Sequence, residues 1–215
     1  STNIASATSV IRDWNQNLWL GTDGGGLFRL APDGTKSRYT QSTNALPNDA
    51  VMCLAVDKRG KLWISTYMGG ITTYTPNEGF RNFSSDFKLM KVNTMLYDSV
   101  HDKLYFGTLG HGTQVLSFPS MEIETYHSLT ETEWIGALLL DNDGVLWMGR
   151  TDGLRSIDAR TGKELFPDVI KKLEKIAIST AFKDMDGSLW FGGPSGLYQY
   201  VKTTDEIQHF TVDSG

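Results

Sequence analysis

The sequence predicts an all-β protein, a β-propeller built from five four-stranded blades that form part of a seven-bladed propeller. Three observations predict it: a strand motif that recurs about every 43 residues, tight-turn residues at fixed places in each repeat, and a composition suited to short strands. The 215 residues include 22 Gly but only 6 Pro, and 11% are aromatic. Repeats of 40 to 45 residues with four strands each are typical of propellers.

The recurring motif is an apolar strand that reads Leu-Trp-Leu-Gly-Thr where it first appears, at Leu18. Similar strands begin at Leu62, Leu104, Leu146 and Leu189. The aromatic residue in second place is predicted to be the wedge that packs between blades, since aromatic side chains bury the largest area. The five wedge positions are Trp19, Trp63, Tyr105, Trp147 and Trp190, spaced by 44, 42, 42 and 43 residues.

An aspartate and a glycine accompany each aromatic residue. The aspartate stands six residues before the aromatic, or seven in the third repeat, and begins a turn rich in Asn, Asp and Gly; its positions are Asp13, Asp57, Asp98, Asp141 and Asp184. The glycine follows the aromatic by six or seven residues and is expected to open the third strand, at Gly26, Gly70, Gly112, Gly153 and Gly196. Turn residues of this kind are typical of tight hairpins.

Apolar runs before each aspartate and alternating segments after the glycine supply the first and fourth strands. The predicted blades of this single domain span residues 8–42, 49–86, 91–128, 133–170 and 174–212. A helix-like stretch occurs only at residues 170–176, about two turns in a connection. We therefore expect a protein with essentially no helix.

Charge and composition exclude several classes of function. The net charge of −5 disfavours a nucleic-acid partner, which needs a cation-rich surface. No apolar run reaches the roughly 20 residues of a membrane-spanning helix. The single cysteine, Cys53, lies in an apolar strand and is expected to be buried and inert. The chain begins at Ser1 without a charged and apolar leader, so we expect any targeting signal to have been removed or to lie outside it.

Residues 42–66 contain Leu46-Pro47, a following apolar run, Asp57 and Leu62-Trp63-Ile64-Ser65-Thr66. This pattern resembles the two-component regulator propeller repeat, and all five units share it, although Tyr105 replaces Trp in the third. The resemblance implies the periplasmic sensor region of Bacteroides-type hybrid two-component histidine kinases, an inner-membrane protein. Its remaining blades and sensor domains would be partners, and kinase activity would belong to the full-length protein, this fragment being no enzyme itself. The pairing of two copies is a further expectation.

A ligand face can be placed by strand parity. The loops after the second and fourth strands emerge at one end of a blade and the aspartate turns at the other, and the former vary more between repeats. We expect an oligosaccharide, or another small polar ligand, at the variable end. The candidate residues are Asp23, Tyr67, Lys91, His111, Trp134 and Arg150. Tyr67 and Trp134 would stack on sugar rings, Arg150 would bind a carboxylate or sulfate, and Asp23 and His111 would bind hydroxyls.

Two other functions compete with sensing. One is a protein-binding assembly module, as in propeller proteins of type IX secretion, and the other is a propeller lyase similar to the streptogramin lyases. The lyases use a metal and paired histidines, which His111 alone does not supply. No catalytic residue, metal site or cofactor is predicted, because the four histidines lack ligand spacing and the acidic turns lack the terminal Glu of a calcium loop.

Overall fold

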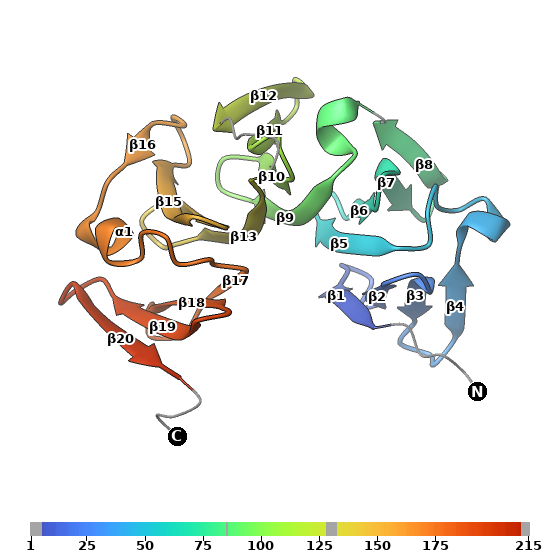
Figure 1. Ribbon diagram of the computed structural model, residues 1–215. Helices are drawn as coiled ribbons and strands as arrows, with labels where there is room; N and C mark the ends of the chain where they lie inside the picture. The colour runs from blue at the N-terminus through green and yellow to red at the C-terminus, as the bar shows by residue number, and fades with distance from the viewer. Residues whose placement is uncertain (1–5, 85, 128–132, 212–215) are drawn as a thin grey trace. The chain divides into compact units, whose positions relative to one another are not determined.

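The structure, a computed structural model, describes residues 6–84, 86–127 and 133–211. It contains five sheets of four strands each, and in every sheet the strands follow one another in chain order (Figure 1). Neighbouring strands pair antiparallel, with Ile11 opposite Trp19 in the first sheet and Ala55 opposite Trp63 in the second. The predicted fold class, all-β with four-stranded propeller blades, is confirmed.

The chain divides into two compact units, Ser1–Thr108 (unit 1) and Leu109–Gly215 (unit 2). Unit 1 contains ten strands: β1 (Ala7–Arg12), β2 (Leu18–Thr22), β3 (Gly26–Leu30), β4 (Lys36–Tyr39), β5 (Val51–Val56), β6 (Leu62–Thr66), β7 (Gly70–Thr75), β8 (Gly79–Ser84), β9 (Val92–Asp98) and β10 (Lys103–Thr108). Two 3₁₀ turns, η1 (Gln41–Thr43) and η2 (Phe87–Leu89), lead from the outer strand of one sheet to the inner strand of the next.

Unit 2 contains β11 (Thr113–Ser117), β12 (Glu122–His127), β13 (Ile135–Leu140), β14 (Val145–Arg150), β15 (Gly153–Asp158), β16 (Glu164–Leu165), β17 (Thr180–Lys183), β18 (Leu189–Gly193), β19 (Gly196–Val201) and β20 (Glu206–Phe210). Its helix α1 (Asp168–Lys172) is shorter than the helix-like stretch of the sequence and begins earlier. Proline at position 167 precedes it, and Val169 and Ile170 are buried in the core beside Trp147.

The turn aspartates bind the repeated tryptophans. In four repeats the indole Nε1 donates a hydrogen bond to Oδ2 of the aspartate six residues earlier: Trp19 to Asp13, Trp63 to Asp57, Trp147 to Asp141 and Trp190 to Asp184, at 2.8, 3.0, 2.9 and 2.7 Å. The other carboxylate oxygen accepts a backbone N–H within the hairpin turn, as Asp57 Oδ1 does from Lys61 at 3.1 Å. One carboxylate thus closes the turn and orients the wedge.

In the third repeat, a different residue bonds to the turn aspartate. Tyr105 has no N–H to offer, and Oδ2 of the buried Asp98 lies 2.6 Å from Nδ1 of His101 instead. Asp98 Oδ1 accepts the backbone N–H groups of Val100 and His101. The residue inserted between Asp98 and Tyr105 therefore accommodates a turn whose histidine replaces the indole donor.

Trp19 and Trp147 each pack against the sheet that follows. Trp19 is fully buried, and its ring centroid lies 5.1 Å from that of Tyr74 in the second sheet. Trp147 is 2% exposed, and Tyr200 of the last sheet lies 6.1 Å from it in the equivalent place. Trp190, in the last sheet, is only half-buried. It stacks between Phe182 and Phe210, which are 50% and 39% exposed.

Hydrogen bonds from side-chain hydroxyls also join neighbouring sheets. The hydroxyl of Thr8 donates to the carbonyl of Val51 at 2.7 Å, and that of Ser65 donates to the carbonyl of Val92 at 2.7 Å. The glycine that opens the third strand has a positive φ, as at Gly26 with +84°. A side chain there would also meet the carbonyl oxygen of Tyr39, so both conformation and space require glycine.

Candidate functional site

The candidate residues of unit 1 lie around the start of the inner strands β5 and β9. Asp23 and Tyr67 occupy the loops after β2 and β6, and both are exposed, Tyr67 to 54%. The segment before β5 connects these loops: Asp49 O accepts the N–H of Gly26 at 2.8 Å, and Ala50 O accepts the N–H of Tyr67 at 2.8 Å. Lys91 is half-buried and directly precedes β9.

The candidate residues of unit 2 lie close together. His111 and Trp134 are both half-buried. Trp134 forms a β-bridge with Leu109, and Gly110 N donates to the carbonyl of Glu133 at 2.8 Å. These bonds hold the loop after β10 against the entry to β13, so the side chains of His111 and Trp134 come from adjoining segments.

Arg150 differs from its predicted role. Its side chain is only 5% exposed, and its guanidinium is paired with two carboxylates of the chain. Nη2 lies 2.6 Å from Glu133 Oε1, and Nε lies 2.8 Å from Asp152 Oδ1. The fork that was expected to bind a ligand's carboxylate or sulfate is thus engaged by protein carboxylates. Arg150 fixes the loop after β14 to the segment that carries Trp134.

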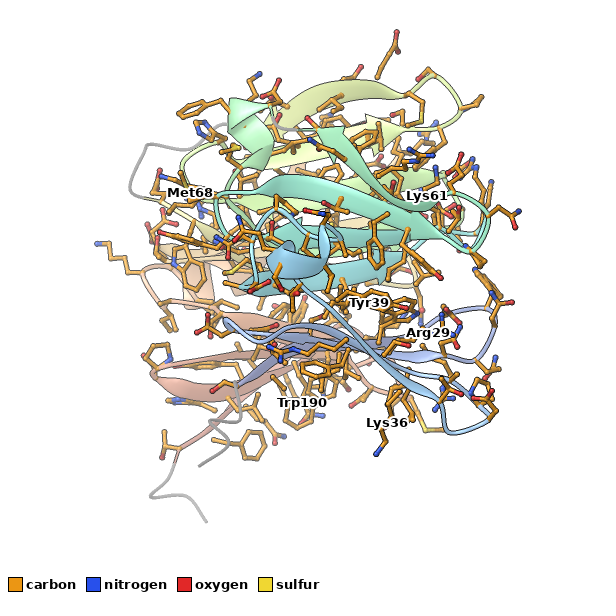
Figure 2. The ribbon with its side chains drawn as sticks, turned by 90° about the vertical axis from the view of Figure 1, so that its right-hand side faces the viewer. Arg29, Lys36, Tyr39, Lys61, Met68 and Trp190 are labelled. Atoms are coloured by element: carbon orange, nitrogen blue, oxygen red, sulfur yellow. The ribbon has the colours of Figure 1, made fainter. Side chains whose placement is uncertain are left out.

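Sequence reasoning overlooked a groove at the other end of the strands of unit 1. Figure 2 shows Met68, in the loop after β6, and Lys61, in the turn before it, at opposite ends of the β5–β8 sheet. On the Lys61 side, a cavity of about 560 Å³ is lined by the turns at residues 14–15, 58–61 and 75–78. The signal in the sequence was Trp14, a large aromatic residue in a turn where the other repeats have Lys58, Ser99, Asn142 or Met185.

A charged network lies next to this groove. Asp102 receives a bidentate hydrogen bond from Arg59, an ion pair from Lys58 at 2.9 Å and a hydrogen bond from Tyr97 at 2.6 Å. These partners, Arg59 foremost, hold the pKa of Asp102 well below its usual range. Burial and the bond to Asp102 raise the pKa of Tyr97 to about 12. The network therefore stays ionised at Asp102 and neutral at Tyr97 throughout the physiological pH range.

The cysteine lies where the sequence placed it. Cys53 is buried in β5, and burial raises the pKa of its thiol, which keeps the sulfur protonated. Within residues 6–84, 86–127 and 133–211, no helix has the length and apolar character needed to span a bilayer. The same residues contain no cluster of three or more His, Cys, Asp or Glu side chains with metal-binding geometry.

Comparison with known proteins gives matches for sequence and fold. The family profile described as "Two component regulator propeller" matches residues 45–68. No curated protein sequence matches the chain significantly. Among solved structures, the chain is similar to the extracellular domain of BT3049 from B. thetaiotaomicron, described as a hybrid two-component system. The TM-score is 0.80 at 22% identity, covering 100% of this chain and 29% of that one.

Two further structures correspond to the competing functions. PorZ, a surface component of the type IX secretion system of Porphyromonas gingivalis, gives a TM-score of 0.73 at 19% identity, with 98% of this chain and 34% of PorZ covered. Virginiamycin B lyase from Staphylococcus aureus gives 0.74 at 16% identity, with 98% and 72% covered. Identities this low establish a shared fold alone. The chain thus spans under a third of the extracellular domain to which it is similar, and its residues 45–68 match the two-component regulator propeller repeat.

Proposed function

We propose that this chain is part of the ligand-binding periplasmic region of a hybrid two-component sensor, and that it helps to detect an oligosaccharide whose binding changes gene expression through a kinase. The match of residues 45–68 to the two-component regulator propeller carries the proposal. The similarity to an extracellular sensor domain supports it further. In this proposal the chain itself performs no chemistry, and catalysis belongs to a kinase elsewhere in the full-length protein.

The variable loops provide groups suited to a sugar. Tyr67 presents an aromatic plane to solvent, and Asp23 on the neighbouring loop offers a carboxylate to hydroxyl groups. In unit 2, Trp134 and His111 offer a second aromatic plane and an imidazole. Lys91 would contribute a positive charge at the entry to β9. Arg150 has a supporting role in this proposal, because Glu133 and Asp152 occupy its guanidinium.

Titration calorimetry on the complete periplasmic region, with neutral, uronic and sulfated tetrasaccharides, tests this function. We expect one class to bind, and Tyr67→Ala or Trp134→Ala to weaken binding at least tenfold because a stacking plane is lost. Phe166→Ala, which removes a 70% exposed aromatic residue, is the matched control and should leave affinity unchanged. Binding that is unaffected by both test variants would refute the site. Absence of binding by every tetrasaccharide would refute oligosaccharide detection.

A protein-binding assembly role is the second candidate, and the similarity to PorZ favours it over a lyase. Such a role predicts capture of a protein partner with no response to sugars. Co-purification from the native membrane, with and without the tetrasaccharides, distinguishes it from sensing. A lyase would need paired catalytic histidines, and His111 has no second histidine beside it in the sequence.

A further inference from the structure

The groove beside Trp14 has the features of a built ligand site. Trp14 is 67% exposed, although tryptophan is the largest apolar side chain in the chain. Its indole Nε1 donates to the carbonyl of Asp57 at 2.8 Å, which fixes the orientation of the ring. Gly60 lies against the five-membered ring, and a Cβ there would come within 3.2 Å of Trp14 Cδ1. The ring is therefore held rigidly while most of its surface remains available.

Amides surround this aromatic plane. Asn15 and Asn77 both line the groove and are exposed. Neither side-chain amide hydrogen-bonds to another residue in the part of the chain that the structure describes. Each offers two donors and an acceptor, the combination that pairs with vicinal hydroxyl groups. A rigid aromatic platform with amides at its edge is chemically suited to a pyranose ring, which has an apolar C–H face and a polar rim.

The groove is also locally cationic in a chain of net charge −5. Lys58, Arg59 and Lys61 line it, and Glu78 is the one acidic residue of its lining. Lys58 and Arg59 share the carboxylate of Asp102 beside the groove. Lys61 and Glu78 lie 3.8 Å apart at 34% and 56% exposure, a weak pair that a bound anion can replace.

We propose that this groove binds an anionic oligosaccharide, with a pyranose ring stacked on Trp14, the amides of Asn15 and Asn77 on its hydroxyls, and a carboxylate or sulfate near Lys61. The ligand class rests on the proposed function. The site is new, because it lies at the end of the strands opposite to the loops of Asp23 and Tyr67 (Figure 2). A propeller surface with one contact at each end of its strands would hold a ligand or a chain of sugars at two separate places.

The alternative is that Trp14 has only a structural role and holds its own turn against the turn that begins at Asp57. Spectra of the ¹⁵N-labelled chain separate the two, because the indole N–H of Trp14 gives its own signal, assigned by its loss in Trp14→Phe. A heparin-derived tetrasaccharide is the anionic probe and cellotetraose the neutral one. We expect the anionic probe to shift the Trp14 signal saturably, with the dissociation constant rising several-fold between 50 and 300 mM salt.

Affinities of variants, measured by titration calorimetry because the Trp14 variants lack the indole signal, decide the assignment. Trp14→Ala should weaken binding at least tenfold, Trp14→Phe less because the plane is kept, and Lys61→Met at least threefold for the anionic probe only. Lys36→Met, with the same change of charge outside the groove, is the control. Unchanged affinity in Trp14→Ala and Lys61→Met, or no saturable shift with either probe, overturns the proposal.

Tyr67→Ala distinguishes the two sites. Binding that depends on Trp14 but not on Tyr67 supports the groove and counts against the loop site described above. Binding that depends on Tyr67 alone overturns the groove and leaves the proposed function standing.

Discussion

Trp63 Nε1 donates a 3.0 Å hydrogen bond to Asp57 Oδ2 at a place where both residues are 1% exposed. The bond joins the wedge of the second sheet to the turn that begins the strand carrying it. Both carboxylate oxygens are used, since Oδ1 accepts the backbone N–H groups of Arg59 and Lys61. Because an unpaired buried polar group is costly, the two residues stabilise the blade as one unit.

Trp63→Ala is expected to destabilise the chain by about 3 to 5 kcal/mol, and Trp147→Ala by a similar amount, because each deletes a buried large aromatic. Trp63→Phe keeps most of the volume but leaves Asp57 Oδ2 without its donor, at about 1 to 3 kcal/mol. Urea unfolding followed by circular dichroism measures all three. A Trp63→Phe variant as stable as the wild type would show that the hydrogen bond contributes nothing.

Gly26→Ala is expected to be more destabilising than Gly34→Ala, although the two glycines have φ values of +84° and +86°. Each substitution carries a backbone cost of about 1 to 2 kcal/mol in the left-handed region. At Gly26 the new Cβ would also collide with the carbonyl of Tyr39, whereas at Gly34 nothing lies within 4 Å. Thermal unfolding of both variants measures the difference between their losses of stability, which is the steric cost at Gly26. Equal losses of stability would mean that the sheet relaxes around the new Cβ at no cost.

The substitution Lys202→Met is expected to make the free energy of unfolding less dependent on pH in the acidic range. Burial acts to raise the pKa of Asp141, but hydrogen bonds from Lys202 at 2.6 Å and from Trp147 outweigh it, so its pKa lies below the ordinary value of 3.8. A carboxyl with a lowered folded pKa contributes stability above its unfolded pKa, and this is lost as the pH falls through the folded value.

Without Lys202, the pKa of Asp141 in the folded chain moves closer to its pKa in the unfolded chain. The variant should therefore be less stable at pH 7, by about 1 to 2 kcal/mol, and lose less than the wild type between pH 5 and pH 2. Urea midpoints across that pH range provide the measurement, with Lys163→Met, at an exposed position outside this pair, as control. Parallel pH profiles for wild type and Lys202→Met would contradict the assigned role of the ion pair.

Phe182→Ser is expected to reduce self-association of the chain. Phe182, Trp190 and Phe210 form a stacked aromatic row on the face that, in the first and fourth sheets, the following sheet covers. An exposed apolar row of this kind favours association between copies. Sedimentation velocity at rising concentration measures it, and Phe166→Ser removes an equally exposed aromatic residue outside the row. A wild-type chain that stays monomeric at high concentration would contradict this prediction.

Spacing in the sequence was enough to predict the sheets. The aromatic residue, the aspartate six before it and the glycine after it predicted β2, β6, β14 and β18 because these positions serve packing, which repeats in every blade. The role of the aspartate as acceptor for the indole could not be predicted from the sequence, since the hydrogen bond from Trp63 to Asp57 depends on the conformation of the turn. The histidine that replaces the indole in the third repeat was hidden for the same reason.

The candidate site was less predictable. Strand parity placed Asp23 and Tyr67 correctly at the loop end, but the type of residue alone could not tell a free guanidinium from one engaged by Glu133 and Asp152. Burial of Arg150 depends on a segment 17 residues earlier in the chain. The Trp14 groove is built by three turns distant in sequence, so only their arrangement in space reveals it.

The hydroxyls of Thr8 and Ser65 have a consequence for solubility. The inner strands β5 and β9 are edge strands, and the free carbonyls of an edge strand can recruit a strand from another molecule. Thr8 and Ser65 occupy the carbonyls of Val51 and Val92 from the sheet before. The first and second blades thereby block part of the exposed edge of the blade that follows, so that side chains of the chain itself protect β5 and β9 from amyloid-like pairing.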